Sequence, residues 1–283
     1  MQVFKTTLLL TLLTVVLLLI GNSLGGQVGL IIALVLAAAM NFSAYFFSDR
    51  IALSTYNAQP ATREQVPRVY RILEGLTARE NLPMPKVYVI PTDAPNAFAT
   101  GRNPRHASVA VTRGILDLLD DAELQGVLGH ELGHVRNRDI LISSTAATIA
   151  GAIMLLARMA GWAALFGGFG GERDGEEGGI LGALALMIVA PIAAMLIQLA
   201  ISRSREYAAD ASGAKWTGDP AALARALEKL EANSRRRPML ATPSTAHLFI
   251  IQPVTREWIA NLFSTHPPIP KRIERLSRME ITG

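Results

Sequence analysis

The chain has 283 residues, of which 50% are hydrophobic and 18% charged, a balance too apolar for an ordinary soluble domain and indicative of membrane-spanning segments. It contains no cysteine, which excludes disulfides and thiolate metal sites, so that any metal site must use histidine and carboxylate ligands. The net charge of +4 is modest and in a membrane protein reflects topology, so we expect no nucleic-acid partner.

Four apolar runs stand out along the chain. A membrane helix needs about 20 mostly apolar residues, with a range of about 17–25. The second and fourth runs fit this length, and the third fits if Arg158 snorkels to the interface at its end. The first is short enough for a signal peptide, but no small-x-small cleavage site follows it, so we interpret it as an uncleaved anchor. The runs are Thr6–Ile20, Gly29–Phe47, Ile140–Arg158 and Gly178–Ile201.

The distribution of lysine and arginine predicts the topology. The segment between the first two runs has no cation and the one between the third and fourth has only Arg173, whereas residues 48–139 carry eleven and residues 202–283 carry thirteen. By the positive-inside rule, both termini and both large polar segments face the cytoplasm. Four membrane spans would place both termini on the same side of the membrane, in agreement with the cytoplasmic location that the charges predict. An alternative makes the third and fourth runs buried hairpin helices of a soluble core.

Between the second and third runs, the sequence predicts a mixture of helix and strand. Residues 67–81 have a helical pattern. The stretch Lys86–Ile90 is β-branched and bounded by prolines, which is typical of a strand. A second strand is expected within His106–Gly114, after the turn-rich sequence TGRNPR.

A helix is expected to begin at Asp120 and to carry the sequence GVLGHELGH. Asp120 can cap it, and Glu123 follows three residues later in a capping-box pattern. His130 and His134 are one turn apart, with Cβ atoms about 5–6 Å from each other, so both can bind one zinc ion. Glu131 lies about 100° further round the helix, where it can act as general base toward a zinc-activated water. The alternative is that the histidines only make surface hydrogen bonds.

Three glycines, Gly126, Gly129 and Gly133, lie along another side of this helix. A glycine in a helix interior costs about 1 kcal/mol relative to alanine. Three of them predict the close approach of another backbone, which is compatible with either interpretation of the histidines.

Two histidines leave a catalytic zinc site one protein ligand short of three. The downstream candidates are His247, His266 and the carboxylates. Glu206 lies five residues after the fourth run and His134 six residues before the third. If these runs form an antiparallel hairpin, their extensions rise together at about 1.5 Å per residue, and Glu206 reaches nearly the depth of His134.

Spacing alone leaves an alternative for Glu206, because it can instead pair with Arg203 or Arg205 at a solvated helix start. Asp210 lies one turn beyond Glu206, on the same face, where it can orient a ligand histidine. The motif lies among charged residues, so we reject a site immersed in the bilayer. A rival function is a non-catalytic zinc-binding scaffold or transporter subunit, but a structural site has no need of Glu131.

Five features in this order resemble the HtpX family of bacterial membrane zinc endopeptidases, in the wider group that includes the CAAX prenyl protease Ste24. The resemblance covers nearly the whole chain and is far more specific than the HExxH motif alone. It implies that His130, His134 and Glu206 are the zinc ligands and that Glu131 is the general base. The features are the N-terminal pair of spans, Asn96–Pro104, GVLGHELGHVRNRDI, Ser202–Ala214 and Leu262–Leu276.

The fold expected from the spans and this resemblance is a mainly α membrane protein with four transmembrane helices and a cytoplasmic α+β zincin-type protease domain. The transmembrane pairs are residues 1–47 and 140–201, and the cytoplasmic parts are 48–139 and 202–283. The resemblance implies a multi-pass protein of the bacterial inner membrane. It would cleave misfolded or damaged membrane proteins at the cytoplasmic face, as part of stress quality control.

The family pattern also assigns a role to the stretch NAFATG. An extended segment beside the site can bind a substrate backbone by strand addition; the alternative is an ordinary turn between strands. The candidate residues are Asn96, Ala97, Phe98, Ala99 and Thr100. His266 precedes two prolines, and the resemblance allows it to steady the oxyanion, while a structural cap on the last helix is equally compatible.

Overall fold

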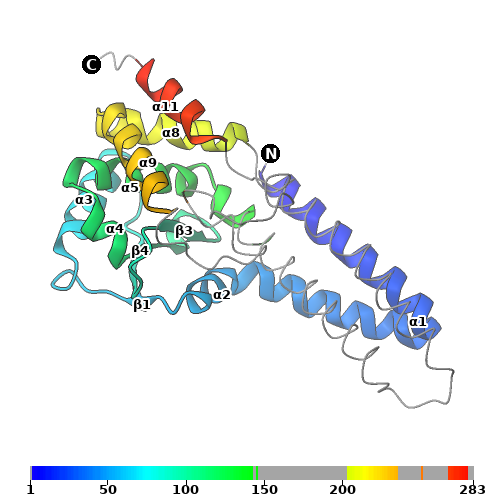
Figure 1. Cartoon of the computed structure of the whole chain (residues 1–283). Helices are drawn as coiled ribbons and strands as arrows, with labels where there is room; N and C mark the ends of the chain where they lie inside the picture. Colours follow the sequence, from blue (N-terminus) through cyan, green and yellow to red (C-terminus); the bar gives the residue numbers. More distant parts are fainter. Residues whose placement is uncertain (1, 143–144, 146–202, 235–249, 251–266, 280–283) are drawn as a thin grey trace.

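The computed structural model describes residues 2–142, 145, 203–234, 250 and 267–279, which form a long helical hairpin and an α+β domain beside it (Figure 1). Most of the third apolar run and all of the fourth lie outside the described residues, as do His247 and His266. The helices are α1 (Gln2–Phe46), α2 (Ser48–Thr55), α3 (Pro67–Arg79), α4 (Arg113–Leu118), α5 (Asp121–Arg136), α8 (Arg203–Thr217), α9 (Pro220–Ser234) and α11 (Ile269–Ser277), and a 3₁₀ turn spans Pro104–His106.

The first two apolar runs both belong to α1, which folds back on itself. The side-chain amide of Asn41 donates a hydrogen bond of 2.9 Å to Thr14 Oγ1, 27 residues away. In a straight helix these residues would be about 40 Å apart. Gly26, whose φ of 54° suits a residue without Cβ, lies between them, and Figure 1 shows the two arms side by side.

One helix in the described part of the chain is long and apolar enough to cross a membrane. Its most apolar window is Gly26–Ser43, and only 11% of that window is buried within the protein. The expected number of four spans is not confirmed, because the third and fourth runs fall outside the described residues.

A four-stranded sheet of order β1-β2-β4-β3 forms the base of the α+β domain. β2 is parallel to β4, and β3 is antiparallel to β4, with Ala99 opposite Val109. Among the described residues β3 is therefore an edge strand, although all five of its residues are buried. The strands are β1 (Gln59–Pro60), β2 (Lys86–Ile90), β3 (Ala97–Gly101) and β4 (Ala107–Thr112). Both strands expected from the sequence are present, and NAFATG is a strand rather than a turn.

The two faces of β3 pack against different helices. Ala97 and Ala99 belong to the main core with the apolar residues of α5. Phe98 points to the other face, in a small cluster with Ala52 and Leu53 of α2, and its ring lies 5.9 Å from that of Tyr56. Because successive side chains of β3 point to opposite faces, one face of the strand packs against α2 and the other against α5.

Helix α5 begins with the expected capping box, since Asp120 accepts from the Glu123 N–H and the Glu123 carboxylate accepts from the Asp120 N–H. Its glycines allow α8 and α9 to approach closely, as their pattern predicts. A Cβ placed on Gly126, Gly129 or Gly133 would lie 3.0, 3.2 or 3.2 Å from the Cα of Leu223, Gly213 or Ala209. Close packing of α5 against α8 brings the side chains of the two helices together at the candidate site.

Candidate metal centre

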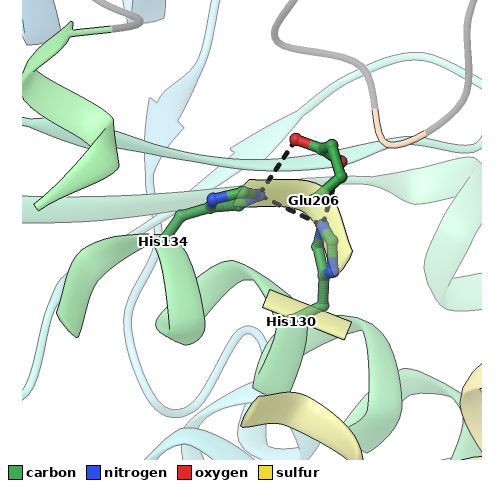
Figure 2. Close-up of side chains that lie close together, drawn as sticks. All are labelled: His130, His134 and Glu206. Carbon is green, nitrogen blue, oxygen red and sulfur yellow. Dashed lines mark hydrogen bonds and ion pairs between the residues drawn. The ribbon is translucent and has the colours of Figure 1, made fainter. Parts of the chain in front are cut away.

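His130 and His134 project from α5, and Glu206 projects from α8, toward one point (Figure 2). The two Nε2 atoms are 3.2 Å apart, and the Glu206 carboxylate oxygens lie 3.5 Å from His134 Nε2 and 3.7 Å from His130 Nε2. Ligands bound to zinc at about 2.0–2.2 Å in tetrahedral geometry are about 3.3–3.6 Å from each other. These three side chains therefore have the spacing and chemistry needed to hold a divalent ion.

In the described part of the chain Glu206 forms ion pairs with His130 and His134, and no hydrogen bond or ion pair joins it to Arg203 or Arg205. Glu206 is 4% exposed and turned toward the histidines, whereas Arg203 is exposed. The terminal nitrogens of Arg205 have no hydrogen-bond partner among the described residues. Glu206 thus belongs to the histidine cluster, where a buried carboxylate between two imidazoles is suited to metal binding.

A second carboxylate, Asp210, contacts the far side of the His130 ring. Asp210 Oδ1 lies 2.9 Å from His130 Nδ1 and leaves Nε2 directed at the site. Such a contact fixes the tautomer and orientation of a ligand histidine. Burial opposes ionisation of Asp210, but the guanidinium of Arg272 outweighs it and lowers the pKa of Asp210 to about 2. Asp210 is therefore anionic near neutral pH.

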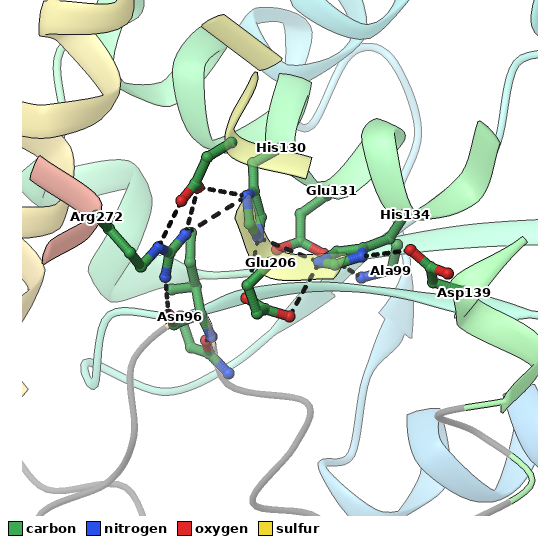
Figure 3. A network of polar contacts seen from close by, with 10 residues as sticks. Asn96, Ala99, His130, Glu131, His134, Asp139, Glu206 and Arg272 are labelled. Atoms are coloured by element: carbon green, nitrogen blue, oxygen red, sulfur yellow. Dashed lines mark hydrogen bonds and ion pairs between the residues drawn. The ribbon is translucent and has the colours of Figure 1, made fainter. Parts of the chain in front are cut away.

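The partner of Asp210 is Arg272, which sequence reasoning missed. Arg272 is fully buried in α11 and donates from Nε and Nη2 to the two Asp210 oxygens at 2.9 and 2.7 Å (Figure 3). Its Nη1 donates to the carbonyl of Ile250 at 3.0 Å. A signal was present, because Arg272 shares the helical spacing of Ile269, Ile273 and Leu276 and so occupies a core position.

Asp139 serves His134 in a similar way and was also missed as a site residue. Its Oδ2 lies 3.4 Å from His134 Nδ1, and the residue is 3% exposed. Arg138 has a left-handed φ of 58° just after α5, and this turn redirects the chain so that Asp139 reaches back to the ring. Burial acts against protonation of His134, but Glu206 and Asp139 outweigh it and raise its pKa to about 9.

Glu131 does not join the three potential ligands but faces the edge strand. Its Oε2 accepts a hydrogen bond of 2.8 Å from the backbone N–H of Ala99 (Figure 3). Burial raises the pKa of the Glu131 carboxyl above its usual value, against the influence of both histidines. A buried carboxylate beside a metal site and a strand edge has the position that a general base for peptide hydrolysis requires.

The other substrate-binding candidates lie along the same strand. Ala97, Phe98 and Thr100 are buried in β3, and Asn96 directly precedes it. The Asn96 side chain accepts a hydrogen bond of 3.2 Å from the N–H of Ile250, so it helps to hold the strand in place. For His266 there is no structural outcome, because it lies outside the described residues; the N-cap of α11 is Pro268.

One helix presents two histidines to a carboxylate from a second helix, and its glutamate faces an edge strand beside them; this arrangement defines a metal-dependent peptidase. Comparison with known proteins agrees with this class. The sequence model of the protein family described as peptidase family M48 matches residues 63–280. The chain belongs to this family; it is a metallopeptidase, and its substrates are polypeptides.

Relatives of similar length support the assignment. A protein named "Protease HtpX homolog" from Syntrophobacter fumaroxidans is 57% identical over 278 residues, covering 98% of this chain and 99% of that one. A protein of the same name from Thermococcus sibiricus is 52% identical and covers 97% and 95% of the two chains. The crystal structure of S. mikatae Ste24p has a TM-score of 0.54 at 20% identity, and the match covers 93% of this chain but only 62% of Ste24p. It supports the fold alone.

Proposed function

We propose that this protein is a zinc-dependent endopeptidase of the bacterial inner membrane. It would cleave misfolded or damaged membrane proteins on the cytoplasmic side. The observation that supports this most directly is the convergence of His130, His134 and Glu206 within 4.8 Å of one another, with Glu131 beside them against an edge strand. Two histidines and one glutamate are the ligand set of a large class of catalytic zinc sites.

Each side chain has a distinct part in the proposed reaction. His130, His134 and Glu206 would hold the zinc ion, which would supply the Lewis acidity that polarises a carbonyl and lowers the pKa of water to about 7. Glu131 accepts the proton of the attacking water and returns it to the amine that leaves. Asp210 and Asp139 hold the two imidazoles in the orientation that directs Nε2 at the ion.

Substrate binding is proposed along β3. The strand lies at the edge of the described sheet, and the Ala99 N–H donates a hydrogen bond to Glu131. A polypeptide that pairs with Asn96–Thr100 in an extended conformation brings a peptide bond beside the general base. Main-chain pairing depends little on side chains, which suits a protease that acts on many unfolded sequences.

The membrane arrangement is proposed from the apolar runs and the charge distribution. Residues 1–47 and 140–201 would form two transmembrane pairs, and residues 48–139 and 202–283 the two cytoplasmic parts. The exposed apolar helix at Gly26–Ser43 and the 25 to 1 division of cations, counting Lys5 and leaving out Arg158, both support it. The catalytic site would lie on the cytoplasmic side, close to the bilayer.

The decisive experiment combines metal content with cleavage. We expect the detergent-solubilised protein to contain one zinc ion per chain and to cleave an unfolded membrane protein until a chelator is added. Glu131→Gln should retain the zinc and lose cleavage, whereas Glu228→Gln, at an exposed position of α9, should change neither. Undiminished cleavage by Glu131→Gln would refute the assigned base. Zinc binding without any cleavage by the unmodified protein would favour the scaffold alternative.

A further inference from the structure

The end of the α1 hairpin that adjoins the protease domain carries a collar of aromatic and cationic side chains. The Phe42 ring lies 4.6 Å from that of Phe46 and 6.0 Å from that of Phe47, and the Tyr45 ring lies 4.9 Å from that of Phe46. Two arginines rest on these rings, from different parts of the chain. The collar consists of Phe42, Tyr45, Phe46, Phe47, Arg50 and Arg102.

Both arginines contact the same connected group of rings. The Arg50 guanidinium lies 5.5 Å from the centre of the Phe47 ring, and that of Arg102 lies 5.3 Å from the centre of the Phe46 ring. Neither forms an ion pair with a carboxylate in the described part of the chain, unlike Arg63, which stacks on Tyr70 but pairs with Glu74. The collar therefore carries two arginines that form no ion pair with a described acidic side chain.

The collar lies where a lipid headgroup would be. The most apolar window ends at Ser43, and at about 1.5 Å per residue Phe46 and Phe47 stand about 5–6 Å beyond it. Phe46 and Phe47 are 42% and 37% exposed, and a contiguous group of exposed aromatic rings at the end of an apolar helix is typical of a membrane interface. Arginines at this height are within reach of phosphate groups.

We propose that the collar binds the headgroups of anionic phospholipids and thereby sets the height of the edge strand above the bilayer. This rests on the proposed membrane location of the protein but not on its proposed reaction. Arg102 directly follows Gly101, the last residue of β3, and Phe98 of the same strand packs on α2, which continues from the collar. A headgroup held by Arg50 and Arg102 joins the hairpin to the strand whose Ala99 N–H reaches Glu131.

The test measures lipid binding separately from cleavage. Purified full-length protein in a neutral detergent is mixed with phosphatidylglycerol, phosphatidylcholine or inorganic phosphate, and the thermal unfolding midpoint is recorded. We expect phosphatidylglycerol to raise the Tm, and phosphatidylcholine or inorganic phosphate to leave it unchanged. In the Arg50→Gln/Arg102→Gln protein we expect at least half of that rise to be lost.

Two further variants make the result specific. Arg63→Gln/Arg278→Gln removes two exposed, ion-paired arginines away from the collar and should keep the full rise in Tm. Arg50→Lys/Arg102→Lys keeps the charge and should restore most of the rise, which separates lost lipid binding from a damaged fold. An equal rise in the Gln variant of the collar would overturn the proposal, as would an equal rise with phosphatidylcholine or with inorganic phosphate. None of these outcomes depends on cleavage.

Discussion

Arg272 of α11 and Asp210 of α8, which are 62 residues apart in the sequence, form a buried ion pair with two hydrogen bonds. Because Asp210 also contacts His130, the pair connects the last described helix of the chain to the HExxH helix through three residues. The orientation of a potential metal ligand therefore depends on a side chain from α11. Removing one partner of a buried pair typically costs about 3–5 kcal/mol, since the other charge stays buried and unpaired.

The first prediction concerns this pair. Arg272→Met should weaken zinc binding about 10- to 100-fold, because Asp210 loses the contact that fixes it against His130. Zinc affinity can be measured by competition with a chromogenic chelator, together with the thermal midpoint. Arg278→Gln, at an exposed position that follows the same helix, serves as control and should leave the zinc affinity unchanged. An unaltered affinity in Arg272→Met would contradict the positioning role.

The second prediction concerns the release of a proton from His134 when zinc binds. With a pKa of about 9, which is above the ordinary value of 6.5, the His134 ring carries a proton at pH 7.5, and zinc binds only the neutral imidazole. Zinc binding should therefore release a proton at this pH, and the apparent affinity should rise with pH up to about 9. Calorimetric titrations in buffers of different ionisation enthalpy count the protons.

Asp139→Asn provides the matched variant for that experiment. The substitution removes one of the carboxylates that raise the pKa of His134, so fewer protons should be released at pH 8. If the number of released protons is the same in both proteins, the proposed influence of Asp139 on His134 is wrong.

The third prediction tests the contact between α5 and α8. A Cβ on Gly213 would lie 2.7 Å from the backbone nitrogen of His130, so Gly213→Ala must push the helices apart and should cost about 1–3 kcal/mol. Zinc affinity should fall with it, because the ligands come from both helices. On Gly75 in α3 a Cβ meets nothing within 4 Å, and Gly75→Ala should stabilise by about 0.5–1 kcal/mol. Urea unfolding and chelator competition measure the two effects.

The fourth prediction addresses the membrane arrangement. Since the chain has no cysteine, single cysteines can be introduced without background. Arg105→Cys, at an exposed position after β3, should react with a membrane-impermeant maleimide only after the cells are opened. Asp174→Cys, between the third and fourth apolar runs, should react in intact cells. Protection of both positions, or labelling of both, would contradict the four-span topology.

Sequence patterns predicted the helices and strands that are determined by residues close to one another in the sequence. The β-branched run at Lys86–Ile90 and the capping box at Asp120 specify a strand and a helix start through neighbouring residues alone. Glu206 lies beside the two histidines, as expected, but the hairpin of apolar runs from which its position was argued lies outside the described residues, and spacing alone also allowed a pair with Arg203 or Arg205. The contact of Arg272 with Asp210 could not be predicted, because the two residues lie on different helices and sequence periodicity does not show which buried arginine pairs with which carboxylate. Likewise, Asp139 acquires its contact only through the left-handed turn at Arg138.

The hydrogen bond from Ala99 to Glu131 has a consequence for the order of events during proteolysis. If a substrate peptide binds to β3 by strand addition, as we propose, it would need the Ala99 N–H that Glu131 now occupies, so that peptide binding would release the Glu131 carboxylate. A folded segment that cannot extend along β3 would leave the Glu131 carboxylate hydrogen-bonded to the Ala99 N–H. Binding to the edge strand would thus select unfolded polypeptides that can extend along β3, irrespective of their side chains.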